Sequence, residues 1–243
     1  MFPIKDTIPT RKPPLITWLI IGINVIIFMF ELSVPRDVLN KIFYIFGVVP
    51  ARYSHPQWAM WLGLRIDDWW PFVTSMFLHG GWMHLISNMW TLWIFGDNVE
   101  DRMGHLRFFV FYLLSGIIAG LVHFIFNYNS TIPTVGASGA IAGVLGAYMV
   151  LFPRANIITL VPIFFYPMFI AIPAVFYLFV WFFSQFLSGL IALASPSNVG
   201  GVAWWAHIGG FVFGLIVVKI FVRSKEKYYY FDEFGYRSSW NYY

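Results

Sequence analysis

The chain lacks cysteine and has few charged residues. With no cysteine among its 243 residues, disulfides, thiolate metal sites and a cysteine nucleophile are excluded. Charged residues make up only 11% of the sequence, whereas soluble globular domains carry about 25%. So few charges cannot cover a water-facing surface, and 59% of the residues are hydrophobic. The composition therefore predicts an all-α membrane protein that crosses the bilayer several times.

Six apolar stretches are candidates for spans, each of which takes roughly 20 residues. They lie at about residues 15–32, 81–99, 106–127, 138–152, 173–194 and 203–222. The fourth is short and rich in small residues, unlike a helix that faces lipid. The first follows a polar, proline-rich start with no cleavage site after it, which favours a retained helix over a signal peptide. We therefore expect a short N-terminal tail at 1–14, a six-helix domain at 15–222 and an aromatic-rich C-terminal tail at 223–243.

A loop of about 48 residues separates the first two expected spans. It is aromatic and contains the stretch WAMWLGLRIDDWWP. Tryptophans mixed with a few charges suit the membrane–water interface. We expect a partly embedded loop that folds into short helices on the outer face.

Lysine and arginine indicate the orientation of the chain. Six spans put both termini on one side of the membrane. That side holds most of the 15 basic residues, namely Lys5, Arg11, Lys12, Arg102, Arg107, Arg154, Lys219, Arg223, Lys225, Lys227 and Arg237. The other side holds the rest, all in the long loop: Arg36, Lys41, Arg52 and Arg65. The positive-inside rule then predicts cytoplasmic termini, and we expect the cell membrane of a prokaryote.

One serine stands among small residues in the stretch TVGASGAIAG. Ser138 lies between Gly136 and Gly139, at the start of the expected fourth span. Backbone N–H groups at a helix start are free to bind a negatively charged oxygen. Such donors would stabilise the oxyanion of an acyl-transfer reaction, and the glycines would let a substrate backbone approach.

A histidine in the sixth expected span is the candidate base for this serine. His207 lies about one turn in, and Gly210 and Gly214 follow it on a stripe of small residues. A similar stripe begins at Gly139 in the fourth span, so the two helices can pack closely. That packing would bring His207 toward Ser138, and histidine is the usual base near neutral pH.

Two further polar residues lie at the same expected depth. His84 and Asn88 are four residues apart in the second span, so they share one helix face and could donate hydrogen bonds to the oxyanion. Each candidate also has an ordinary explanation: Ser138 as a helix cap, His207 as a packed histidine, the other two as contacts between helices. His79 and His84 make a poor zinc pair. The residues alone leave a hydrolase and simple packing both open.

The motifs resemble those of the rhomboid family of intramembrane serine proteases, from about Pro14 to Val222. GASGAIAGVLGAY resembles the family's G-x-S-G motif, and AHIGGFVFG resembles A-H-x-x-G-x-x-x-G. HGGWMHLISN resembles the outer histidine followed by H-x-x-x-N, and GDNVEDRMG resembles the E-x-R turn. The resemblance implies that Ser138 is the nucleophile, His207 the base, and His84 and Asn88 the oxyanion donors. It implies supporting roles for His79, Gly136, Gly139, Gly210, Gly214, Glu100 and Arg102.

The resemblance also implies the reaction and its surroundings. It implies a six-helix core with a water-filled cavity open to the outer side, capped by the fifth span and the loop at 195–202. A Ser–His dyad would hydrolyse peptide bonds in or beside transmembrane helices of other membrane proteins. The expected partners are those proteins and the lipid bilayer, with no cofactor, metal or nucleic acid.

Two positions depart from the family pattern. Many members have arginine where this chain has Pro71 after Trp70, and that arginine would tie down the outer loop. Ala142 replaces an aromatic residue that stacks on the histidine in some members, and Trp204 and Trp205 are the candidate supports in its place. Two other functions stay open: an inactive relative that only holds membrane clients, and a channel or transporter.

Overall fold

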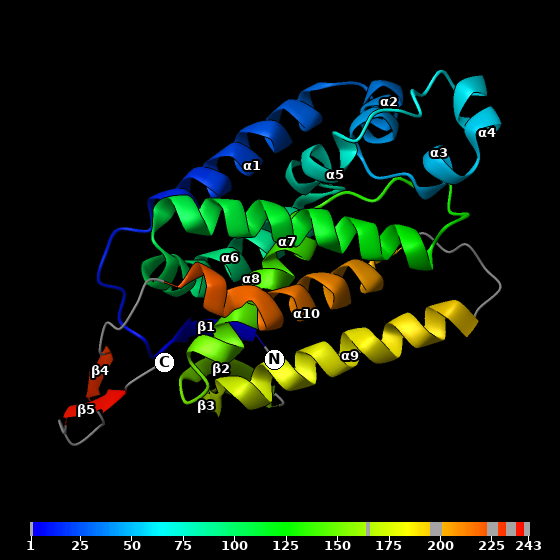
Figure 1. Cartoon of the computed structure of the whole chain (residues 1–243). Coiled ribbons are helices and arrows are strands. Elements are labelled where there is room, and N and C mark those ends of the chain that lie inside the picture. Colours follow the sequence, from blue (N-terminus) through cyan, green and yellow to red (C-terminus); the bar gives the residue numbers. More distant parts are fainter. Residues whose placement is uncertain (1, 164–165, 195–200, 223–227, 232–236, 241–243) are drawn as a thin grey trace.

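The computed structural model describes residues 2–163, 166–194, 201–222, 228–231 and 237–240. Helices dominate this part of the chain (Figure 1). The longer ones are α1 (Leu15–Ser33), α6 (Trp82–Met103), α7 (His105–Phe126), α8 (Ser138–Leu151), α9 (Ala174–Ala194) and α10 (Trp204–Phe221). A helix therefore stands at each of the six places where a span was expected.

The six-span prediction is met in part. Among the described residues, α1, α7, α9 and α10 are long and apolar enough to cross a membrane, and α8 is a shorter apolar helix. The 22-residue α6 is not in that group. His84, Asn88, Asp97 and Asn98 lower its hydropathy. By composition alone, α6 is therefore not predicted to cross the membrane.

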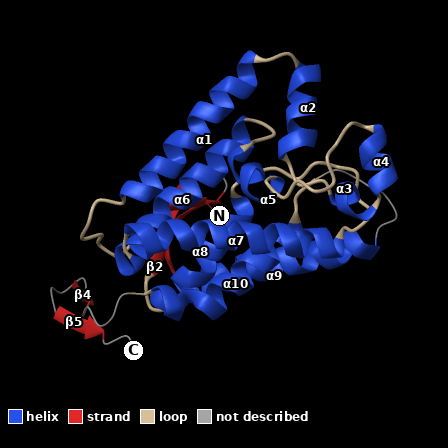
Figure 2. Cartoon of the chain, turned by 45° about the horizontal axis from the view of Figure 1, so that its top comes forward, coloured by secondary structure: helices blue, strands red, loops and turns tan. Residues whose placement is uncertain are grey.

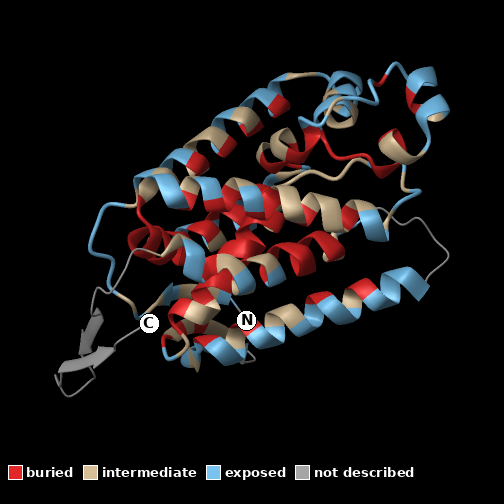
Figure 3. Cartoon of the chain, in the orientation of Figure 1, coloured by how far each residue is buried: buried red, intermediate tan, exposed pale blue. Residues whose placement is uncertain are grey.

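Helix α8 lies inside the bundle and packs against α6, α7 and α10. Figure 3 shows α8 buried, whereas much of α9 is exposed. Glycines let α8 and α10 approach very closely: a Cβ on Gly210 would run into the backbone of Gly139, and one on Gly214 into that of Gly143. This close approach fixes the relative position of the first turns of both helices.

The start of α1 is capped by a residue from α6. The Glu100 carboxylate accepts hydrogen bonds from the backbone N–H groups of Ile16 (2.9 Å) and Thr17 (2.8 Å). It also accepts from the Thr17 hydroxyl and contacts His105 Nδ1 at 2.6 Å. A carboxylate at a helix N-terminus satisfies free donors and complements the helix dipole. Glu100 thus joins α1 to the end of α6 and the start of α7.

The long loop folds into the expected short helices. They are α2 (Arg36–Phe46), α3 (Pro50–Ser54), α4 (Pro56–Trp61), α5 (Pro71–Thr74) and the 3-10 helix η1 (Ser75–Phe77). Arg52 is buried and binds the carbonyl oxygens of Ile45 (2.9 Å) and Arg65 (2.7 Å). It also pairs with the Asp68 carboxylate at 3.3 Å. An arginine therefore ties this loop together, although it does not come from the position that Pro71 occupies.

The fold is mostly helical, as expected, but it is not all-α, because strands are also present. β1 (Phe2–Asp6), β2 (Asn156–Ile163) and β3 (Tyr166–Pro173) form an antiparallel sheet in the order β1-β2-β3. Further along the chain, β4 (Tyr228–Phe231) pairs with β5 (Arg237–Trp240). Residues 156–173 are rich in β-branched residues and prolines, which favour strands and disfavour helix. The expected N-terminal tail thus contains a strand of this sheet.

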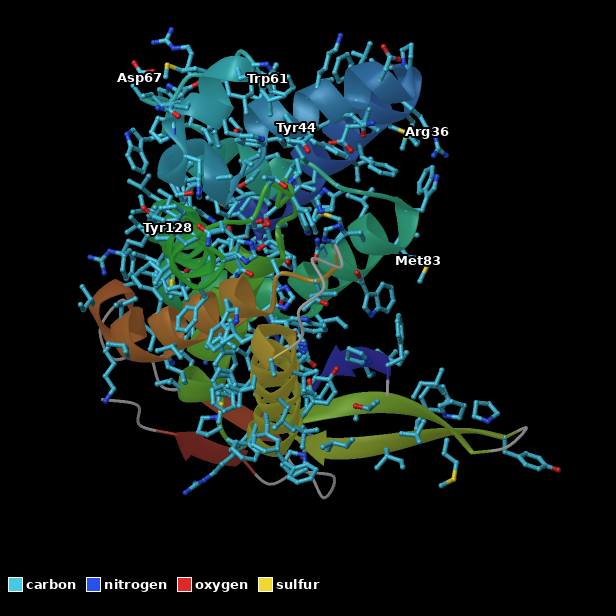
Figure 4. All side chains as sticks on the ribbon, turned by 90° about the vertical axis from the view of Figure 1, so that its right-hand side faces the viewer. Arg36, Tyr44, Trp61, Asp67, Met83 and Tyr128 are labelled. Atoms are coloured by element: carbon cyan, nitrogen blue, oxygen red, sulfur yellow. The ribbon has the colours of Figure 1, made fainter. Side chains whose placement is uncertain are left out.

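The sheet and the short helices lie at opposite ends of the bundle. Figure 4 shows β2 and β3 projecting at one end and the labelled residues Arg36, Trp61 and Asp67 at the other. Figure 2 shows the same separation from another side. The bundle therefore has two distinct ends, and α8 and α10 both run toward the end with the strands (Figure 1).

Candidate active site

Ser138 and His207 form a hydrogen bond. Ser138 Oγ lies 2.8 Å from His207 Nε2. Ser138 is the first residue of α8, and His207 lies in the first turn of α10. His207 is buried and Ser138 is half-buried, so the hydroxyl is the more accessible of the two groups. The close packing of α8 on α10 brings together these two residues, which are 69 positions apart in the sequence.

At position 136, two residues before Ser138, only glycine fits. Gly136 has a φ of +124°, a conformation that residues with a side chain rarely adopt. Its N–H donates to the Ser75 carbonyl oxygen at 2.8 Å, which anchors the turn. A Cβ at this position would lie 2.6 Å from the imidazole ring of His84. The glycine therefore allows the loop to pass directly beside that ring on its way to Ser138.

His84 and Asn88 flank this loop from α6. Asn88 Nδ2 would be 3.6 Å from a Cβ on Gly136, next to the His84 ring. Both side chains thus lie beside the segment that leads into Ser138. The first N–H groups of α8 at Ser138 have no acceptor within their own helix. Side-chain donors from α6 therefore lie beside the segment that leads to the free backbone N–H groups of α8.

His79 supports Asn88 from the segment before α6. Its Nε2 lies 3.0 Å from Asn88 Nδ2, and its backbone N–H donates to the Glu31 carboxylate at 3.2 Å. Burial, together with the nearby His84, lowers the pKa of His79 to about 3. A neutral imidazole can accept the amide hydrogen at Nε2. Sequence reasoning missed Glu31, although a buried carboxylate in an apolar helix is a signal for a specific partner.

An amide from α9 holds the other side of the histidine ring. Gln185 Oε1 lies 2.8 Å from His207 Nδ1, and both side chains are buried. Sequence reasoning missed this residue as well. A single glutamine in the middle of an apolar helix is the signal that could have found it. Because Ala142 offers no ring one turn after Ser138, this hydrogen bond is a main contact of the imidazole.

Two tryptophan rings lie near the histidine. The centroids of Trp181 and Trp204 are 5.9 Å and 6.3 Å from that of His207. Trp204 is thus beside the ring, as the sequence suggested. Trp205 instead stacks on Phe126 at a centroid distance of 3.8 Å.

His123 in α7 holds the loop before the serine. Its Nε2 lies 2.9 Å from Thr134 Oγ1. The Thr134 backbone also pairs in both directions with Val48, at 2.8 and 3.0 Å. In the structure His123 is buried and anchors the serine loop.

The remaining expected residues lie farther from the serine. Glu100 and Arg102 are buried in the last turns of α6, at the end of the bundle with the strands. Their position supports packing rather than chemistry at Ser138. Residues 195–200 of the expected cap loop lie outside the described residues.

The sequence profile of the rhomboid domain matches residues 67–224, more than half of the chain. The chain belongs to the rhomboid family. The matched region contains the whole of α6 to α10, and therefore Ser138, His207, His84 and Asn88. This is a family of intramembrane proteases with several membrane-spanning helices.

Individual relatives agree with this assignment. The chain is 41% identical over 116 residues to Rhomboid-like protein 11, chloroplastic, of Arabidopsis thaliana, covering 45% of this chain and 41% of that protein. It is 43% identical over 82 residues to Rhomboid protease GluP of Bacillus subtilis (strain 168), covering 34% of this chain and 16% of GluP. It is 29% identical over 155 residues to the human Presenilin-associated rhomboid-like protein, mitochondrial, covering 60% of this chain and 36% of that protein. The chain thus spans less than half the length of each of these relatives.

Proposed function

We propose that this rhomboid is a serine endopeptidase that cleaves membrane proteins in or next to a transmembrane helix. The observation that carries the proposal is the 2.8 Å hydrogen bond between Ser138 Oγ and His207 Nε2 at the start of α8. A serine hydroxyl is a weak nucleophile until a base takes its proton. The relative named Rhomboid protease GluP supports the same activity.

The reaction would proceed through an acyl-enzyme. His207 Nε2 takes the hydroxyl proton as Ser138 Oγ attacks the scissile carbonyl carbon. The protonated His207 then gives that proton to the leaving amine, and the ester to Ser138 forms. A water molecule, deprotonated by His207, hydrolyses the ester and restores both residues.

The negative charge on the carbonyl oxygen would be stabilised from two sides. The backbone N–H of Ser138 points outward from the first turn of α8, where the helix dipole is positive. His84 and Asn88 lie beside the preceding loop and would add side-chain donors. Preorganised donors of this kind stabilise a tetrahedral intermediate strongly in a site with little water.

The substrate would be a transmembrane helix of another protein. Such a helix hides its carbonyl groups in internal hydrogen bonds, so it must unwind before Ser138 can attack. Small residues or helix breakers near the cleavage site lower the cost of unwinding. We therefore expect substrates that carry such residues close to the membrane surface.

The site would open to the outer side of the membrane, with both termini in the cytoplasm. Ser138 and His207 lie at the starts of α8 and α10, and both helices end at the end of the bundle where the strands lie. The bias of lysine and arginine toward that end supports a cytoplasmic position for it. Water would then reach the serine from the outer phase.

The test is cleavage of a single-span substrate by the purified protein in lipid vesicles. We expect the wild type to produce two fragments and Ser138→Ala to produce none. An inactive relative that only holds clients would bind the substrate and leave it intact. Intact substrate with both proteins would therefore refute the protease and favour that alternative.

A further inference from the structure

Gln185 is an amide side chain in the mostly apolar helix α9. Its side chain is buried, and its Oε1 lies 2.8 Å from the nitrogen of His207 that faces away from the serine. Burying an amide is unfavourable unless its groups find partners. The partners of Gln185 are therefore informative about what the residue does.

The hydrogen bonds around Gln185 determine how its amide is turned. Ser184 Oγ donates to the carbonyl oxygen of Trp181 at 2.6 Å, which uses the single hydroxyl hydrogen. The Ser184 oxygen can then only accept, and Gln185 Nε2 donates to it at 3.0 Å. With the amide nitrogen turned toward Ser184, the oxygen of Gln185 must face His207.

This orientation selects one form of the imidazole. An amide oxygen can only accept, so His207 Nδ1 must carry the hydrogen of that bond. Neutral His207 then has its lone pair on Nε2, which faces Ser138 Oγ at 2.8 Å. That tautomer is the one able to take the hydroxyl proton.

We propose that Gln185 is the positioning residue of the Ser138–His207 dyad and fixes the tautomer and the orientation of the base. The inference rests on the proposed protease function. Gln185 does not touch the reacting atoms and acts through His207 alone. Its oxygen also accepts a stronger hydrogen bond once His207 is protonated, as happens while Ser138 attacks. The contribution of Gln185 therefore appears in the rate of attack rather than in substrate binding.

Three variants in α9 test this role. Gln185→Met has a similar length and offers only a weak acceptor, whereas Gln185→Glu keeps an oxygen acceptor at the same reach. Leu187→Met is the matched control, because Leu187 is a nearby exposed residue of α9. Each protein is assayed in two ways: by the rate at which a small fluorophosphonate labels Ser138, and by kcat and KM for a single-span substrate.

The expected pattern separates chemistry from packing. Gln185→Met should lower both kcat and the labelling rate by roughly 10–100-fold, the loss typical of a hydrogen bond to a charged group, and leave KM within about twofold. Gln185→Glu should recover most of both rates, and Leu187→Met should match the wild type. A contact that matters only for helix packing would not be restored by an acceptor oxygen.

Other outcomes overturn the inference in distinguishable ways. If the wild type cleaves and Gln185→Met labels at the wild-type rate, Gln185 has no positioning role and the protease function stands. If the wild type is neither labelled nor active, the proposed function and this inference fail together. If Gln185→Met does not fold, the Gln185→Glu variant provides the test. A rate of Ser138 labelling within about tenfold of the wild-type rate supports the positioning role, and a larger loss overturns it.

Discussion

At the scale of single residues, the site is a set of short polar contacts inside an apolar bundle. Ser138 and His207 form its centre, and Gln185 holds the far side of the ring. His84 and Asn88 lie beside the loop before the serine. His207 is held by Gln185 and Asn88 by His79, and such supporting contacts preorganise a catalytic site.

The oxyanion donors give the first prediction. Removing one such donor typically lowers kcat by about 10²–10³. We expect Asn88→Ala to lose activity in this range and to keep a measurable rate, because the Ser138 N–H remains. Steady-state cleavage of a single-span substrate measures the effect. Wild-type turnover in the double variant His84→Ala, Asn88→Ala would remove this role from both residues.

The sequence predicted the pair Ser138 and His207, which form a hydrogen bond in the structure, but not the residues that hold their neighbours in place. Ser138 and His207 lie in short motifs with recognisable spacing, so the sequence alone could point to them. Gln185 lies 22 positions from His207, and Glu31 lies 48 positions from His79. A polar residue in an apolar helix signals that a partner exists, but tertiary packing alone determines which residue that partner is.

At the scale of elements, the contact between α8 and α10 determines whether the dyad forms. The oxygen of Gly139 lies where a Cβ of Gly210 would stand, and Gly143 and Gly214 repeat the contact one turn further along. Small residues were expected at this interface from their spacing. The helices therefore cannot keep their present separation if larger side chains are introduced.

Enlarging one glycine should separate the dyad. Gly210→Ala forces α10 away from α8, and overpacking of this kind typically costs about 1–3 kcal/mol. We expect a lower melting temperature and strongly reduced cleavage. Gly22→Ala in α1 is the matched control, because no atom lies within 4 Å of its added Cβ. Gly210→Ala with wild-type melting and activity would show that the close approach is dispensable.

The strands were the least predictable elements. Residues 156–163 combine β-branched residues with a proline, and the following strand begins and ends near prolines as well. That composition opposes helix, but it does not reveal that β1 would pair with β2 across more than 150 positions. The pairing depends on α8 returning the chain to the end of the bundle where the N-terminal segment lies.

The contact between β1 and the bundle predicts that the stability of the folded protein depends on pH. Asp6 accepts hydrogen bonds from Tyr148 Oη (2.5 Å) and Asn98 Nδ2 (2.8 Å). Burial raises the pKa of Asp6 to about 7, above its ordinary value of about 4 in an unfolded chain. Between these two pKa values, Asp6 of the folded protein holds a proton that the unfolded chain has released. The stabilisation of the fold by this proton is complete below about pH 4 and is lost as the pH rises through 7.

Thermal unfolding between pH 5 and 8 measures this effect. We expect the melting temperature of the wild type to fall with rising pH in this window. Asp6→Asn keeps a hydrogen-bonding group and cannot ionise, so its melting temperature should depend less on pH. Identical slopes for the two proteins would contradict the role of Asp6.

At the scale of the whole molecule, the two ends of the bundle differ in structure. The short helices lie at one end and the sheet at the other (Figure 4). Helices α8 and α10 both run toward the sheet, so the dyad at their starts lies on the side away from it (Figure 1). The basic residues predict which end faces the cytoplasm, because Lys5 lies in β1, Arg102 in the last turn of α6 and Lys219 in the last turn of α10. The position of the dyad near the opposite end then predicts where substrates are cut.

Single cysteines in this cysteine-free chain test the orientation. Asp67 lies in the long loop and Tyr166 at the start of β3, and both side chains are well exposed. An impermeant maleimide added to intact cells should label Asp67→Cys and spare Tyr166→Cys, while both are labelled after lysis. The reverse pattern in intact cells would place the dyad toward the cytoplasm.

The central claim is that His207 activates Ser138 as a nucleophile. The most direct measurement is to treat the purified protein with a fluorophosphonate and locate the adduct by mass spectrometry of its peptides. We predict one adduct, on Ser138, in the wild type, and none above background in Ser138→Ala or His207→Ala. Labelling of Ser138→Ala to the wild-type extent, or an undiminished Ser138 adduct in His207→Ala, would contradict the account.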